Sequence, residues 1–239
     1  MVIKPLFDHA SAGVLWLGIF YLAALPSTVS SSVVMVSVAG GNIQAAIFNA
    51  SLSSLLGIFI TPLWMSLFLD SASGDFDLAS VMGKLMLQVL LPVVIGILLH
   101  SKGVLFAEKN RSRLKLFDQS IILLIIYNSF RQSFYHHVFD DLRLVELLLL
   151  GVGMMALFLI VFRLLNFISR LLKFKKEDRI TVLFCGSKKS LVHGTVMSKV
   201  LFTPKATTGM IFLPLMLYHS LQLVMASMIA KRMASAEEK

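Results

Sequence analysis

Charged residues are scarce in this 239-residue sequence, and cysteine is almost absent. Charged residues make up 15% of the chain and hydrophobic residues 57%, whereas soluble domains carry charge on about a quarter of their residues. The single cysteine, Cys185, excludes an intrachain disulfide, and no Cys/His spacing resembles a zinc site. This composition predicts an integral membrane protein without a separate soluble domain.

The apolar blocks also lack the motifs of intramembrane chemistry. They contain no Gly-x-Ser-x-Gly, no acidic pair and no His-Glu-x-x-His run, so no nucleophile has a partner base. A retinal photoreceptor would need a carboxylate near its lysine, yet no Asp or Glu lies deep in any apolar block, and Glu146 lies near the end of one. We therefore expect a protein that is not an enzyme and needs no cofactor.

The sequence does contain long apolar blocks separated by short charged stretches. A membrane-spanning helix needs about 20 apolar residues. Seven blocks meet this requirement, near residues 11–38, 43–69, 80–99, 116–135, 144–168, 180–202 and 207–230. We expect an all-α, multi-pass membrane domain over residues 1–239, with the lipid bilayer as its surroundings.

The net charge of +9 follows membrane topology and does not indicate nucleic-acid binding. Fourteen of the 22 Lys and Arg residues lie within Ser101 to Lys115, within Arg163 to Arg179, or from Lys231 onward. Basic loops stay in the cytoplasm, which predicts a multi-pass protein of the cell inner membrane with a cytoplasmic C-terminus. Counting back places residue 1 outside, although residues 1–10 contain no signal peptide. We therefore expect an odd number of spans upstream of Met1.

Two spans are interrupted. The first contains Leu25-Pro26-Ser27-Thr28-Val29-Ser30-Ser31-Ser32, and the sixth contains Gly186-Ser187-Lys188-Lys189-Ser190. Proline removes a backbone donor and clashes with the preceding turn. Backbone without helical bonds at membrane depth must be buried in protein or line a watery cavity. Broken helices at matching positions of two halves indicate the binding site of a secondary transporter.

The breaks lie five spans apart, and one unbroken span follows each. If the halves are repeats, each has five spans and the two are inverted in the membrane. Residues 11–69 then end the first repeat, residues 80–230 form the second, and three helices are missing before Met1. Three is an odd number, in agreement with the odd number of upstream spans expected from the positions of the basic residues.

Each break also has a structural interpretation. Serine is common where membrane helices pack closely, and Lys188 and Lys189 would snorkel at the interface if the sixth span began late. A span beginning after Ser190 would be too short to cross. Because a charge at the bilayer centre costs about 2.5–3.5 kcal/mol, we favour a watery, anion-accepting site at the lysines.

Three other groups of polar residues are weaker candidates. Asn49 and Ser51, with Ser53 and Ser54, either face the first break or bond to neighbouring helices. His193 either relays a proton or is a structural histidine. His136-His137 with Asp140-Asp141 could ligate a metal, but adjacent histidines in a loop rarely share a face, so we expect a solvated loop without metal.

Together, the two breaks resemble the bile acid:sodium symporter family, and in particular its bacterial SBF-like branch, which is related to solute carrier family 10 member 7. Residues 25–42, 51–57 and 61–62 are similar to the family's fourth and fifth helices. Residues 184–191 with Gly194 are similar to the ninth. The resemblance covers the whole chain as helices four to ten of ten.

The resemblance implies a core domain and a panel domain, with the fourth and ninth helices unwound and crossing. In sodium-coupled members, ions bind at the crossing and an organic anion lies between the domains. Ser30, Ser31 and Ser32 match the first crossing motif, in a run about one residue longer. Ala46 and Ala50 fall at the fifth-helix hydroxyl positions, and Lys188 and Lys189 replace the acidic and glutamine sodium ligands.

We therefore expect a secondary transporter of small organic anions. An ammonium at the crossing supplies a fixed cation and repels sodium, which argues against sodium coupling. Proton coupling would follow if a lysine lost its proton during the cycle. The expected binding residues are Thr28, Ser30, Ser31, Ser32, Asn49, Ser51, Ser187, Lys188, Lys189 and Ser190, with His193 as a proton relay. The alternative is a regulatory or non-transporting membrane protein.

Overall fold

The computed structural model describes residues 9–73, 78–87, 91–137, 140, 143–202 and 207–235. These residues form helices joined by short connections, and no strand occurs among them. The helices are α1 (His9–Ala24), α2 (Ser30–Val38), α3 (Ile43–Ser73), α4 (Leu78–Leu85), α5 (Leu91–Leu98), α6 (His100–Lys109), α7 (Arg111–Tyr135), α8 (Leu144–Leu171), α9 (Lys176–Gly186), α10 (Leu191–Leu201) and α11 (Thr208–Ser235).

Three helices are long and apolar enough to cross a membrane: α3 over Ile43–Leu67, α8 over Leu144–Leu171, and α11 over Thr208–Ser235. Many large apolar side chains on the helices are exposed, including Phe48, Leu98 and Phe134. In water such a surface would be a large unpaired apolar patch. These features confirm the integral membrane character expected from composition.

The first and sixth expected spans are each broken into two helices. Leu25 to Val29 separate α1 from α2, and Ser187 to Ser190 separate α9 from α10. The first break is shorter than expected, because Ser30, Ser31 and Ser32 form the first turn of α2. Helix α1 ends directly before the residue that precedes Pro26, since a proline disfavours helical geometry at the residue before it.

The basic stretch from Ser101 to Lys115, expected as a connection between spans, is not an irregular loop. This stretch is helical, forming most of α6 and the start of α7. The third expected span begins in α4 and ends in α5, and residues 88–90 between them lie outside the described residues. The acidic residues Asp75 and Asp77 also lie outside, whereas α3 continues to Ser73. Helices therefore extend beyond the apolar blocks.

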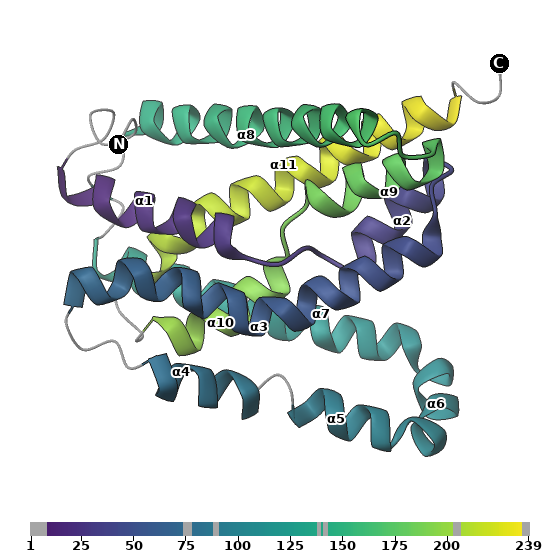
Figure 1. Ribbon diagram of the computed structural model, residues 1–239. Helices are drawn as coiled ribbons and strands as arrows, with labels where there is room; N and C mark the ends of the chain where they lie inside the picture. The colour runs from purple at the N-terminus through teal and green to yellow at the C-terminus, as the bar shows by residue number, and fades with distance from the viewer. Residues whose placement is uncertain are drawn as a thin grey trace.

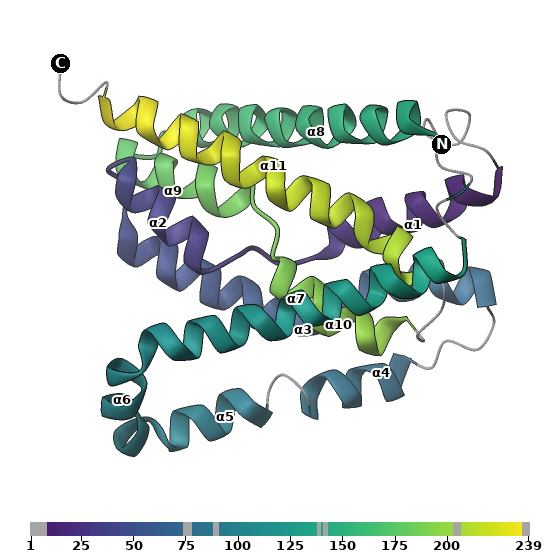
Figure 2. The ribbon, with the colours of Figure 1, turned by 180° about the vertical axis from the view of Figure 1, so that it is seen from behind.

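The helices pack in two parts. Helix α11 contacts α1, α8 and α7, and α9 contacts both α8 and α3. Helices α4 to α6 form an outer row that reaches the rest of the molecule through α3, α10 and α7 (Figure 1). Figures 1 and 2 also show that the strongly basic segments lie at one end of the molecule: α6, the α8–α9 turn and the last turns of α11. The first turns of α1, α4 and α8 lie at the opposite end.

Candidate functional site

The two breaks cross in the interior of the molecule, where the α1–α2 linker passes the α9–α10 linker (Figure 1). The backbone N–H of Ser190 donates to the carbonyl oxygen of Pro26 at 3.0 Å. The last carbonyls of a helix lack partners within the helix, and in α9 two of them accept from serines. Ser27 Oγ donates to Cys185 O at 2.6 Å, and Ser32 Oγ donates to Phe184 O at 3.2 Å. Each break therefore satisfies backbone groups of the other.

The C-terminal end of α1 is capped by a lysine from the second break. Lys189 Nζ donates to the carbonyl oxygens of Ala23 and Leu25 at 2.7 and 2.8 Å. The intervening Ala24 carbonyl accepts from Thr61 Oγ1 at 2.8 Å. Because the C-terminal end of a helix carries partial negative charge, the ammonium neutralises both the unpaired carbonyls and the dipole of α1.

Lys188 reaches the other half of the first broken helix. Its side chain is 1% exposed, and its Nζ donates to the carbonyl oxygen of Ser31 at 2.8 Å. The hydroxyl Oγ of Ser31 is buried and has no hydrogen-bond partner among the described residues. The two lysines thus point in opposite directions from the second break, one toward α1 and the other toward α2.

Helix α11 holds the backbone of the second break. Gln222, which is 0% exposed, accepts from Lys189 N at 2.8 Å and donates to Lys189 O at 2.8 Å. Tyr218 donates its hydroxyl hydrogen to Ser187 O at 2.7 Å, and His219 Nδ1 lies 2.9 Å from Gln222 Nε2. The two hydrogen bonds between Gln222 and the backbone of Lys189 fix the direction in which the Lys189 side chain leaves the backbone.

The structure brings together only part of the expected set of polar residues. Ser32, Lys188, Lys189 and Ser190 lie at the crossing, and Thr28 is buried in the first linker. Ser187 is buried, but its hydroxyl donates back to Leu183 O within α9. Ser30 and Ser51 are exposed, and no described contact joins them to the second break.

His193 and the loop histidines have local partners. His193 Nδ1 lies 2.9 Å from Ser190 Oγ, which also caps the start of α10. His137 pairs with Asp140 at 2.7 Å on the exposed surface, while Asp141 lies outside the described residues. Among the described residues, no group of three or more His, Cys, Asp or Glu side chains is placed to hold a metal ion.

Sequence reasoning missed four residues that support the crossing. They are Ser27, Thr61, Tyr218 and Gln222, each bonded to the backbone of a break or of the half-helix that ends at it. Gln222 and Thr61 were detectable only as isolated polar residues within apolar blocks. Their partners lie 33 and 37 residues away along the chain, so local pattern could not pair them.

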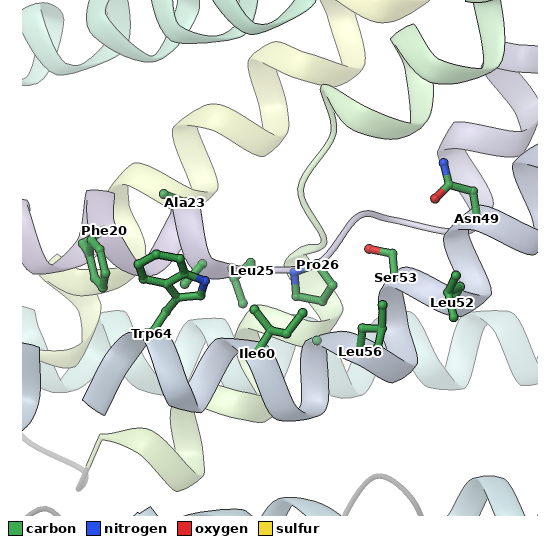
Figure 3. Close-up of a pocket in the computed structure, with 12 residues that line it drawn as sticks. Phe20, Ala23, Leu25, Pro26, Asn49, Leu52, Ser53, Leu56, Ile60 and Trp64 are labelled. Atoms are coloured by element: carbon green, nitrogen blue, oxygen red, sulfur yellow. The ribbon is translucent and has the colours of Figure 1, made fainter. Parts of the chain in front are cut away.

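A cavity of about 630 Å³ lies between the first break and α3. Figure 3 shows Phe20 and Trp64 toward one end and Asn49 and Ser53 toward the other, with Pro26 between them. Ser53 Oγ accepts from the backbone N–H of Ser27 at 3.0 Å. Most of the lining is apolar, so this cavity suits an amphipathic molecule.

Comparisons with known proteins agree with this geometry. The model of the SBF-like CPA transporter family matches residues 1–235. "Uncharacterized protein PA2026" of Pseudomonas aeruginosa is 39% identical over 98% of this chain and 70% of its own length. "Putative symporter YfeH" of Escherichia coli is 40% identical over 91% of this chain and 65% of its own length. "Sodium/bile acid cotransporter 7" of Rattus norvegicus is 32% identical over 92% of this chain and 65% of its own length. The chain thus spans about two thirds of these relatives.

Proposed function

This chain belongs to the SBF-like CPA transporter family. We propose that it functions in sodium-independent secondary transport of organic anions. The observation that carries the proposal is the crossing of two broken helices, each satisfying the backbone of the other. Irregular backbone at membrane depth marks the sites where transporters bind their substrates. The family and two of the three relatives named above are transporters by name, which agrees with the absence of enzyme motifs in the sequence.

Matched hydrogen bonds support the arrangement in which residues 11–69 end the first five-span repeat and residues 80–230 form the second. In each break, a backbone N–H donates to the unbroken helix that follows: Ser27 N to Ser53 Oγ on α3, and Lys189 N to Gln222 Oε1 on α11. A carbonyl at the end of each first half-helix also accepts from that unbroken helix. Thr61 donates to Ala24 O, and Tyr218 donates to Ser187 O. The same pattern of hydrogen bonds therefore joins each broken span to the unbroken helix that follows it.

The lysines support a cycle without sodium. Sodium binds oxygen ligands such as backbone carbonyls, and at this crossing the carbonyls of Ala23, Leu25 and Ser31 accept from ammonium groups. A sodium ion would have to displace a tethered cation and would be repelled by it. The ammonium groups therefore take the place of bound ions in stabilising the crossing.

Lys189 is the lysine that we assign to substrate. Lys188 is buried at 1% exposure, whereas Lys189 is partly exposed. The Ser32, Ser187 and Ser190 hydroxyls are bonded within the protein, whereas the buried Ser31 hydroxyl has no hydrogen-bond partner among the described residues. The apolar part of the anion would lie in the cavity beside Pro26, whose wall includes Ala23 and Leu25.

Thermal unfolding of the purified full chain tests the sodium question without knowledge of the substrate. A ligand at 100 times its dissociation constant stabilises a protein by about 2.7 kcal/mol. We expect equal melting temperatures in sodium chloride and potassium chloride at the same ionic strength. A higher temperature specific to sodium would contradict the proposal.

Uptake into proteoliposomes tests the substrate class. The probes are labelled amphipathic sulfonates and carboxylates, with taurocholate among them, and we expect accumulation that is the same with and without a sodium gradient. Failure of every anionic probe would contradict the organic-anion assignment, and strict sodium dependence would contradict the role of the lysines.

A further inference from the structure

The α8–α9 turn concentrates positive charge at the membrane surface. Helix α8 is long and apolar enough to cross the membrane and ends at Leu171. Its last turns and the following turn carry five exposed basic residues: Arg163, Arg170, Lys173, Lys175 and Lys176. Exposed apolar side chains alternate with them: Phe167, Leu171, Leu172 and Phe174. Within the described residues, neither Lys173 nor Lys175 lies within salt-bridge distance of a carboxylate.

Lys173 occupies a backbone position that favours glycine. Its φ is 55°, in the left-handed region, and it follows α8 in a Schellman arrangement. Lys173 N donates to Arg170 O and Phe174 N donates to Ser169 O, both at 3.0 Å. Helices commonly end on glycine at this position, because side chains at positive φ are strained. The fold alone does not favour a lysine here.

A groove of about 340 Å³ opens beside this turn, between α3 and α9. Phe174 belongs to the turn and also lines the groove, together with Ala45, Phe48, Leu52, Thr181 and Val182, among others. At 1.5 Å per helical residue, Leu52 lies about 14 Å along α3 from Ile43. The groove thus leads from the basic turn toward the apolar interior of the membrane.

Two acidic residues lie near the groove. Asp178 lines it, but its Oδ1 accepts from Asn42 Nδ2 at 2.9 Å. Glu177 is exposed in the first turn of α9. The five basic residues outnumber these two carboxylates, so the turn has a net positive charge.

We propose that the α8–α9 turn and this groove bind an anionic phospholipid of the membrane, with its phosphate at Lys173 and Lys175 and an acyl chain against Phe174 and Phe48. Charge complementarity selects the headgroup, because basic residues next to a membrane helix attract anionic lipids. The apolar groove selects a chain attached to that headgroup. A free phosphate would interact with the basic residues but has no acyl chain to occupy the groove.

The test measures phosphatidylglycerol that stays with the full chain after detergent purification, by mass spectrometry. We expect Lys173→Gly and Lys175→Gln each to weaken retention by about fivefold, the value of one basic residue at a membrane surface. Lys173→Gly should melt at the same temperature or higher, since glycine suits the backbone there. That combination separates lipid binding from a structural role.

Two further variants separate the groove from surface charge in general. Ala45→Leu places a larger side chain in the groove and should lower retention with the turn unchanged. The control is the double variant Lys109→Gln, Arg113→Gln, at exposed positions of the other basic segment, which should retain as much lipid as the wild type. Unchanged retention in Ala45→Leu, or an equal loss in the control, would overturn the proposal.

Discussion

Lys189 combines a structural contact with the proposed role of binding the substrate anion. Its ammonium caps two carbonyls of α1, and its backbone is held by Gln222. A substrate anion near this ammonium would compete with carbonyls of the same half-helix. Under the proposed function, substrate binding would therefore be coupled to the end of α1.

Replacement of Lys189 by leucine tests that coupling at the scale of one residue. The carbonyls of Ala23 and Leu25 lose their donor, and an unpaired buried polar group costs about 1–3 kcal/mol. We expect Lys189→Leu to melt at a lower temperature and to lose anion uptake. Lys199→Leu, at an exposed position of α10, should keep uptake. Normal uptake by Lys189→Leu would show that this lysine is not needed to bind the anion.

Gln222 offers a second test, because it bonds only the backbone of Lys189 and the neighbouring His219. Gln222→Leu leaves the N–H of Lys189 without a partner and its carbonyl with only the longer contact from His219 Nδ1 at 3.4 Å. We expect a loss of about 1–3 kcal/mol in unfolding free energy. Chemical unfolding in detergent measures it. Gln44→Leu, at an exposed position on α3, should lie within about 0.5 kcal/mol of the wild type. Equal stability of the two variants would show that the clamp contributes nothing.

At the scale of helices, the closest packing joins α1 to α11. A Cβ placed on Gly18 would lie 2.6 Å from the backbone oxygen of Ile211, whereas one on Gly13 would meet nothing within 4 Å. The small residue therefore sets the distance between the two helices, as is usual where membrane helices approach closely. Because backbone atoms oppose it, the clash cannot be relieved by rotating a side chain.

A matched pair of alanine variants measures this packing. Gly18→Ala should lower unfolding free energy by about 1–3 kcal/mol through overpacking. Gly13→Ala, on the same helix, should be neutral or stabilising by up to about 1 kcal/mol, because alanine favours helix. Thermal unfolding of both variants decides it. A stable Gly18→Ala would place the helices farther apart than the structure does.

The breaks were predictable because their signals are local. Pro26 ends α1 by removing a backbone donor, and two lysines within an apolar block are visible without any structure. The position of Ser30 to Ser32 was not predictable, because three serines beyond a proline suit either a linker or the first turn of a helix. The geometry at Lys189 depends on contacts from α11. Nothing in the sequence around Gln222 indicates that this residue bonds to Lys189.

The basic stretch from Ser101 to Lys115 shows a limit of charge patterning. Charge indicates where chain leaves the membrane, but it does not distinguish a loop from a surface helix. Lysine and arginine are good helix formers, so α6 and the start of α7 remain helical. The side of the membrane can therefore be expected from the sequence, while the local structure there depends on propensity and packing.

For the whole molecule, the positions of the basic segments agree with one membrane orientation. Helix α6, the α8–α9 turn and the end of α11 lie at the same end (Figures 1 and 2). These segments are distant in sequence, so their grouping comes from how the helices are arranged. Basic segments on one side are retained in the cytoplasm, so we predict that Ser235 lies inside and the start of α4 outside.

Cysteine labelling tests this orientation, because the protein has one cysteine, Cys185, and it is 2% exposed. A membrane-impermeant maleimide should leave the wild type unlabelled. We expect Ser80→Cys, in the first turn of α4, to react in intact spheroplasts of a bacterial host. Ser235→Cys should react only after the membrane is inverted or opened, because its end of the molecule carries the retained charge. The reverse labelling pattern would show that the molecule has the opposite orientation in the membrane, with the proposed lipid site in the outer leaflet. The crossing of the two broken helices would remain in place, because its hydrogen bonds do not depend on which side faces the cytoplasm.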